Sequence, residues 1–186
     1  MGLNHVGSVE IVTERLILRR LKESDKEDIY TNLAHDKLVS KTFKLPYYEN
    51  IDNMNAFMTT YLSRSADINT YFWVIELKKK SEAIGIFVTP SRSDSDFTIE
   101  VGWALGSNYW GKGYAAEALR AVIKFFFTEI GYNRITAAHF VGHDSSGLVM
   151  EKAGMRYEGM RRQEVFYRGQ FIDTENYYIL REEWNF

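Results

Sequence analysis

A short segment with two glycines is the part of the sequence best suited to bind a ligand. It runs from Tyr109 to Glu117 and reads YWGKGYAAE. Gly111 and Gly113 allow the backbone to turn tightly and to approach a ligand without an intervening Cβ atom. The apolar residues that follow recur at helical spacing, and the first amides of a helix lack acceptors and carry the positive end of its dipole. The segment is therefore a candidate cradle for a pyrophosphate.

Two other phosphate-binding patterns do not fit this segment. It lacks the spacing of a Walker loop with its Lys-Ser/Thr pair, and it lacks the third glycine of a dinucleotide fingerprint. A tight turn without any ligand is the alternative interpretation of the two glycines taken by themselves. Support for a ligand site must therefore also come from the elements that surround the two glycines.

Hydrolase and metal chemistry are poorly supported. The run from His143 to Ser146 has the composition of a catalytic triad, but neighbouring loop residues cannot aim at one another as a triad requires. The Gly-x-Ser-x-Gly nucleophile elbow is also absent. The four histidines have no acidic partners at metal-binding spacing, so we expect no metal site.

Composition narrows the class of protein further. The 186 residues are 45% hydrophobic and carry a net charge of −2, which favours a globular domain and argues against nucleic-acid or membrane partners. No apolar run approaches the ~18 residues of a spanning helix. There is no cysteine, which excludes disulfides, thiolate metal sites and an acyl-cysteine intermediate, and makes the cytoplasm the expected location.

The hydrophobic periodicity predicts an α+β domain over residues 1–186, with its core over about 13–180. We expect strands over 11–20, 71–77, 83–89, 97–105, 134–140, 156–167 and 173–180. We expect helices over 24–35, 51–64, 115–130 and 144–154, with residues 36–48 as a loop. A helical crossover between the fourth and fifth strands predicts a mixed, mostly antiparallel sheet of six to seven strands with about four helices.

Several residues are predicted to begin or end these helices. Ser24 and Glu27 have the spacing of a capping box, and Asp144 is placed to cap the last helix. Gly131 and Gly154 are placed to end the helices that precede them.

The glycine segment resembles the coenzyme A loop of the GNAT (Gcn5-related N-acetyltransferase) superfamily, in particular the RimJ/RimL-like branch of ribosomal-protein N-terminal acetyltransferases. The family pattern is Arg/Gln-x-x-Gly-x-Gly/Ala, with Gly113 and Ala115 at its small positions. Trp110 departs from Arg/Gln, but YWGKGYA is typical of the branch. A second segment, from Arg134 to Gly159, is similar to the family's penultimate strand and the helix after it, and the runs that carry the similarity are 143–146, 149–155 and 158–159.

The resemblance implies a GNAT-like fold, acetyl-coenzyme A as cosubstrate and direct acetyl transfer to a primary amine in a ternary complex. A peptide or protein N-terminal α-amine is the acceptor nearest to this branch. A small amine, such as a polyamine or aminoglycoside, is the alternative, and a non-catalytic acyl-CoA sensor is the alternative from another class. The sequence is compatible with a monomer or a homodimer.

The resemblance also assigns site residues. Glu100 is expected to act as the base through a water, although a strand carboxylate that faces solvent or pairs with an arginine is an equal interpretation. Met150 stands where relatives carry a tyrosine acid, so Ser146 is expected to hydrogen bond the departing sulfur, unless it only satisfies the start of its helix. His143 replaces an asparagine that helps to hold pantetheine.

The coenzyme contacts are expected from these residues: Val101, Trp103, Trp110, Gly111, Lys112, Gly113, Tyr114, Ala115, Ala116, His143 and Ser146. Acceptor contacts are expected from Tyr47, Tyr48 and Glu164, and Phe43 belongs to the same aromatic segment.

Overall fold

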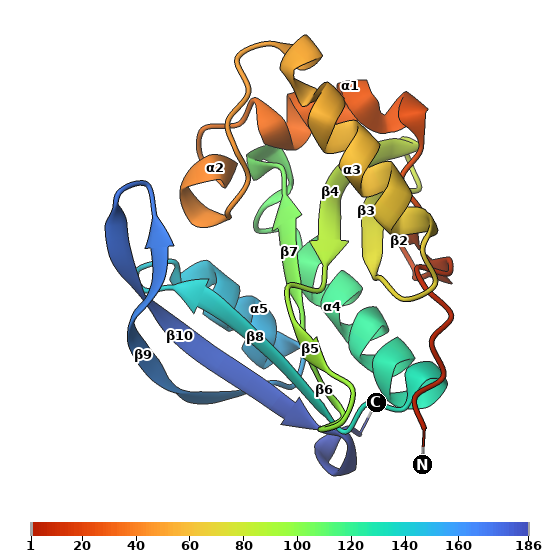
Figure 1. The fold of residues 1–186 in the computed structure, drawn as a ribbon, viewed down its shortest axis with the longest axis vertical. Coiled ribbons are helices and arrows are strands. Elements are labelled where there is room, and N and C mark those ends of the chain that lie inside the picture. The colour runs from red at the N-terminus through yellow and green to blue at the C-terminus, as the bar shows by residue number, and fades with distance from the viewer. Residues whose placement is uncertain (1, 186) are drawn as a thin grey trace.

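Two five-stranded sheets form the framework of the computed structural model, which describes residues 2–185 (Figure 1). The first sheet is antiparallel, with the order β1 (Ile11–Val12), β2 (Leu16–Arg19), β3 (Phe72–Leu77), β4 (Glu82–Val88) and β7 (Gly102–Leu105). The second has the order β5 (Arg92–Ser93), β6 (Thr98–Glu100), β8 (Arg134–Phe140), β10 (Gln170–Leu180) and β9 (Arg156–Tyr167).

Helices occupy the connections between these strands. They are α1 (Lys26–Ile29), α2 (Val39–Thr42), α3 (Asn55–Ala66), α4 (Tyr114–Phe125) and α5 (Asp144–Lys152). Within residues 2–185, no helix is long and apolar enough to cross a membrane.

The first sheet is buried on both faces, which explains why β3 is an almost unbroken apolar run. Trp73 and Ile75 pack into the cluster that includes α4, whereas Phe72 and Val74 pack into the cluster that includes α1 and α3. Successive side chains of a strand point to opposite faces, so only a sheet covered on both sides can bury all four residues.

The second sheet is covered on one face only. Ala137 and Tyr177 pack with Met150 of α5 on that face. The alternate residues Thr136 and Asn176 line an open cavity on the other face. Polar side chains therefore stand on the uncovered side of the sheet, as the two-residue period of a strand requires.

The two sheets separate at Val101, and this separation builds the site. Thr98 to Glu100 pair in parallel with β8, whereas Gly102 to Leu105 pair with β4. The amide of Val101 still donates to the carbonyl oxygen of Thr136 at 2.8 Å, and beyond it β7 and β8 diverge (Figure 1). Among the described residues, β7 has no strand on its outer edge.

The predicted α+β class is confirmed, and so is the parallel pair created by the helical crossover. The strands predicted as one mixed sheet form two five-stranded sheets, of which the second is the mixed one. The single strand expected over 97–105 is instead two strands in different sheets, because its backbone bonds change partner at Val101. The strand expected over 11–20 is instead the hairpin β1–β2, in which Ile11 lies opposite Leu18. The loop expected over 36–48 contains α2.

Two of the predicted caps are wrong. Asp25 rather than Ser24 satisfies the turn before α1, because its Oδ2 accepts from the Lys22 amide at 2.8 Å. Asp144 is the first residue of α5 and makes no capping bond, and His143 occupies the cap position. Gly131 and Gly154 do follow the helices that they were expected to end, with φ of 100° and 86°.

A buried ion cluster ties β2 to β3 and to the turn before α1. The Arg19 guanidinium donates to both carboxylate oxygens of Asp25 at 2.8 Å and to Glu76 at 2.5 Å. The hydrogen bond with Asp25 is the largest of the effects that raise the pKa of Arg19.

Candidate functional site

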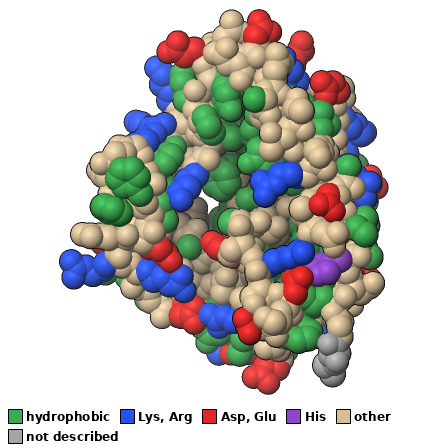
Figure 2. Space-filling model, in the orientation of Figure 1, with side chains coloured by type: hydrophobic (Ala, Val, Ile, Leu, Met, Phe, Trp, Pro, Cys, Tyr) green, Lys and Arg blue, Asp and Glu red, His purple; other side chains and the backbone are tan. Residues whose placement is uncertain are grey.

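Two connected hollows lie where the sheets separate. The smaller, of about 230 Å³, lies against the glycine segment and is called the loop cavity. The larger, of about 990 Å³, lies over the uncovered face of the second sheet and is called the open cleft. Thr42 and Phe43 line both, so the two hollows meet beside the end of α2. Figure 2 shows the face on which the molecule is hollowed between the two sheets.

The glycine segment has the geometry of an anion cradle. Gly111 and Gly113 have φ of 74° and 80°, a left-handed conformation that favours glycine, and an added Cβ on Gly111 would meet no atom within 4 Å. The first backbone bond at the start of α4 is from Glu117 to the carbonyl of Gly113, at 3.1 Å. The amides of the residues between them are left to bind a ligand.

Nine of the eleven residues predicted to contact the coenzyme line the loop cavity. They are Trp103, Trp110, Gly111, Gly113, Tyr114, Ala115, Ala116, His143 and Ser146. Val101 lines the open cleft instead. Lys112 lines neither hollow, and its Nζ donates to the carbonyl oxygen of Asn108 at 2.7 Å.

Thr13 and Arg15, from the N-terminal part of the chain, hold the glycine segment in place through Glu117. Glu117 accepts from the Thr13 hydroxyl and the Arg15 Nε, both at 2.6 Å, and from the Arg15 amide at 2.8 Å. Arg15 Nη1 donates to the carbonyl oxygen of Lys112 at 2.9 Å, and its guanidinium lies 4.6 Å from the centre of the Tyr114 ring. Burial opposes ionisation of Glu117, but these hydrogen bonds outweigh it and lower the pKa of the carboxyl.

His143 closes one side of the loop cavity, with its ring centre 6.1 Å from that of Trp110. Burial, followed by the nearby His139, lowers the pKa of His143, so the imidazole is neutral at pH 7. A neutral imidazole offers one donor and one acceptor, so it can both donate and accept, as the amide of the expected asparagine can.

Helix α5 contributes lining residues that the sequence argument missed. Ser145, Val149 and Lys152 line the loop cavity together with the predicted Ser146. Residues 145, 149 and 152 share one helical face, so their spacing of four and three was a usable signal. Thr42 also lines the loop cavity, at the end of a helix that was not predicted in residues 36–48.

Glu100 and Glu164 both line the open cleft, but their surroundings differ. Glu100 Oε2 accepts from the Ser91 hydroxyl at 2.7 Å, and among the described residues no group bonds its other oxygen. Glu164 accepts from Arg161 at 2.6 Å through one oxygen and from the Thr174 hydroxyl through the other. Burial raises the pKa of Glu164, but these hydrogen bonds outweigh it and lower the pKa overall.

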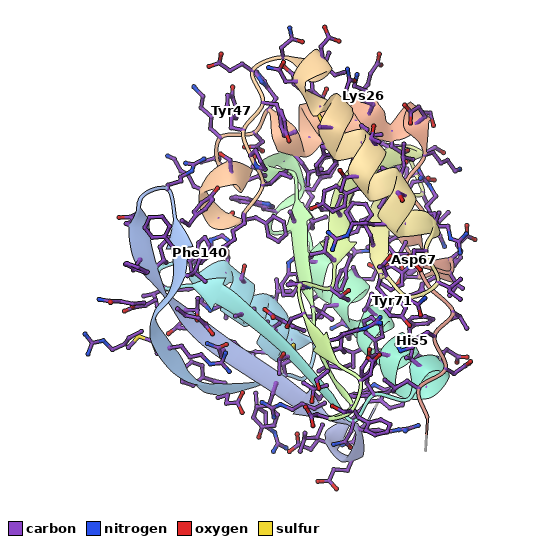
Figure 3. The ribbon with its side chains drawn as sticks, in the orientation of Figure 1. His5, Lys26, Tyr47, Asp67, Tyr71 and Phe140 are labelled. Atoms are coloured by element: carbon purple, nitrogen blue, oxygen red, sulfur yellow. The ribbon has the colours of Figure 1, made fainter. Side chains whose placement is uncertain are left out.

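The two tyrosines expected to contact the acceptor do not line either hollow. Tyr47 stacks on His35 with ring centres 5.1 Å apart, and Tyr48 packs among the residues beneath α3. Figure 3 shows Tyr47 well away from Phe140 and Tyr71, which line the open cleft from its two sides. Phe43, from the same aromatic segment, is the one that reaches the site.

The sequence is similar to a known protein family and to characterised relatives. The family model described as "Acetyltransferase (GNAT) domain" matches residues 15–156. The Escherichia coli ribosomal protein uS5-alanine N-acetyltransferase is 24% identical over 91% of this chain and 90% of its own length.

Solved structures have the same fold. A GNAT-family acetyltransferase from Bacillus anthracis is 27% identical, with a TM-score of 0.81 over 94% of this chain and 99% of the other. RimL, a ribosomal L7/L12 α-N-protein acetyltransferase solved with coenzyme A, is 16% identical, with a TM-score of 0.80 over 92% of this chain and 98% of the other.

Proposed function

Because this chain belongs to the GNAT acetyltransferase family, we propose that it transfers the acetyl group of acetyl-coenzyme A to the N-terminal α-amine of a peptide or protein. The observation that carries the proposal is the junction of the two hollows. The loop cavity fits a pyrophosphate-bearing coenzyme, and it opens beside Thr42 and Phe43 into a much larger cleft that holds Glu100.

The size of the open cleft favours an extended acceptor. Its volume of about 990 Å³ lies at the upper end of the ~300–1,000 Å³ that hold drug-sized ligands. The uS5-alanine and L7/L12 acetyltransferases, by their names, modify ribosomal proteins, which supports a peptide acceptor here.

The coenzyme is expected to lie along the unpaired edge of β7, with its pyrophosphate at the start of α4. The free amides at Tyr114, Ala115 and Ala116 would bind the phosphate oxygens, and the positive end of the helix dipole adds to that attraction. When bound, acetyl-coenzyme A supplies an acetyl group activated as a thioester.

In this proposal Glu100 prepares the acceptor. An α-amine has a pKa of about 7.7–8.0, so much of it is protonated at pH 7 and must lose a proton before it can attack a carbonyl carbon. The oxygen of Glu100 that has no partner among the described residues can take that proton directly or through one water. The nitrogen–carbon bond then forms as the carbon–sulfur bond breaks.

Ser146 is placed on the coenzyme side of the junction. It lines the loop cavity near the start of α5, and its hydroxyl can donate to the departing sulfur. Its amide donates to the carbonyl oxygen of His143 at 3.0 Å, which orients this first turn of α5.

The proposal is tested by incubating the purified protein with acetyl-coenzyme A and three acceptors. These are a peptide with a free α-amine, the same peptide with a blocked N-terminus and an internal lysine, and spermidine. Mass spectrometry should show acetylation mainly on the free α-amine. Transfer mainly to spermidine would overturn the peptide acceptor, and binding of acetyl-coenzyme A without turnover on any amine would indicate a sensor.

A further inference from the structure

The charged side chains of the open cleft do not balance. Five cations and three carboxylates line it, so the lining has a formal charge of five minus three, or +2, while the whole chain carries −2. These residues are Lys44, Arg64, Arg92, Arg134, Arg161, Glu100, Glu158 and Glu164. The cleft is therefore a basic region in an acidic protein, and its potential favours an anionic ligand.

Three of the five cations are already paired. Arg134 bonds both oxygens of Glu158 at 2.6 Å, and Arg161 bonds Glu164 at 2.6 Å. Arg92 lies 3.3 Å from Asp94, a residue outside the cleft lining.

Lys44 and Arg64 make no ion pair with any described residue. Lys44 follows α2, and Arg64 lies in the last turn of α3, so both belong to the wall that faces the second sheet. The only side-chain partner of the Arg64 guanidinium within residues 2–185 is the Tyr61 ring, 5.6 Å away. Figure 2 shows basic side chains on two sides of the central hollow.

Glu100, in contrast, stands on β6 of the second sheet, whereas α3 packs on the first sheet. It is the carboxylate of the cleft that no cation pairs with among the described residues, because Glu158 and Glu164 are occupied. The wall formed by the second sheet thus suits an amine at Glu100, and the opposite wall, which carries Lys44 and Arg64, suits an anion.

We infer that the acceptor is an acidic peptide, whose α-amine lies at Glu100 while an Asp or Glu side chain within its first few residues binds Arg64 and Lys44. This inference rests on the proposed function and names its substrate class. A peptide satisfies both groups because its backbone spans ~3.3–3.6 Å per residue and can carry the charge across the cleft. Opposite charges on the two walls also fix the direction in which the peptide enters.

The experiment compares kcat/KM on three peptides that differ only at positions 2–5, where they carry Asp/Glu, Asn/Gln or Lys residues. The acidic peptide should be preferred over the neutral one by about fivefold at low salt, and less at higher ionic strength. In Arg64→Gln and Lys44→Gln the ratio of kcat/KM on the acidic peptide to kcat/KM on the neutral peptide should fall toward one. The double variant Arg64→Glu/Lys44→Glu should prefer the basic peptide.

Lys79→Gln is the matched control, because Lys79 is an exposed lysine in the β3–β4 turn, outside the cleft lining. It removes the same charge and should leave the acidic preference unchanged. Equal rates on all three peptides, or a preference that survives both cleft variants, would overturn the inference and leave the proposed function intact. Faster transfer to free glutamate than to any peptide would show that the acceptor is a small acidic amine and would overturn the inference that it is a peptide. No transfer to any of these amines would overturn the proposed function and the inference with it.

Discussion

Glu100 and Glu164 show how hydrogen bonding decides what a carboxylate can do. Both oxygens of Glu164 are bonded, and the resulting fall in its pKa holds it in the ionised form. Such a group is a poor proton acceptor and a good structural anchor. Glu100 keeps one oxygen without a partner among the described residues, which makes it the better candidate for the base.

We therefore expect Glu100→Gln to lower kcat by about 100-fold or more at pH 7, within the usual range for loss of a general base. The affinity for acetyl-coenzyme A, measured by calorimetry, should not change. The defect should shrink above pH ~8, because solvent then deprotonates an α-amine whose pKa is about 7.7–8.0. Glu164→Gln is the control, and an equal loss of kcat in that variant would contradict the assignment.

The start of α4 is the element on which we expect coenzyme binding to depend. Gly113 has a φ of 80°, and an added Cβ would lie 3.4 Å from Nη2 of Arg15. Gly113→Ala should cost about 1 kcal/mol of stability through backbone strain. It should also weaken acetyl-coenzyme A binding about tenfold, since a shift of the loop forfeits about one hydrogen bond.

Gly169→Ala separates the two effects. Gly169 has a φ of 81° in the β9–β10 turn, with no atom within 4 Å of an added Cβ. Its substitution carries the same backbone strain but should leave coenzyme affinity unchanged in calorimetry. Equal affinity in both variants would show that the Gly113 conformation is not needed for binding.

Arg15 acts on the same element from outside it. In Arg15→Gln the guanidinium bonds to Glu117 and to the carbonyl of Lys112 are lost, so the glycine segment loses part of its support. We expect KM for acetyl-coenzyme A to rise about three- to tenfold with kcat nearly unchanged, because Arg15 positions the loop and does not touch the reacting atoms. Arg156→Gln removes a comparable pair, Arg156–Glu183 at 2.6 Å, and should change neither constant. A fall in kcat alone would contradict this role.

At the scale of the whole molecule, the Arg19 cluster connects the first sheet to the helical layer above it. Asp25→Asn leaves the buried Arg19 guanidinium without its bidentate partner. The loss of one member of a buried ion pair costs about 3–5 kcal/mol, and because Arg19 keeps its bond to Glu76, urea unfolding should show a decrease of at most that size in the free energy of unfolding. At temperatures where the variant is folded, kcat should be unchanged.

The exposed Glu182 provides the comparison for that measurement. Glu182→Gln should change the free energy of unfolding by less than about 0.5 kcal/mol, as is usual for surface substitutions. A similarly small effect of Asp25→Asn would mean that the cluster is not a structural anchor.

The features that the sequence determined by itself are those built from neighbours along the chain. The glycine segment and the start of α4 were predictable because the proposed binding groups are backbone amides, whose arrangement depends on two glycines and a helix start. The residues of α5 that line the loop cavity could also have been predicted, since a helix brings residues 145, 149 and 152 to one face. The strand over 134–140 agrees with its predicted limits because its buried and less buried residues alternate along the chain.

Only the tertiary structure decided the break at Val101, the approach of α2 to the junction and the positions of Tyr47 and Tyr48. Each depends on which distant segment a residue packs against. The charge of the open cleft is of the same kind, because its residues come from both sheets and from the ends of α2 and α3. Local patterns determine the backbone of a few residues, whereas a cleft and its unpaired charges exist only after remote elements have packed together.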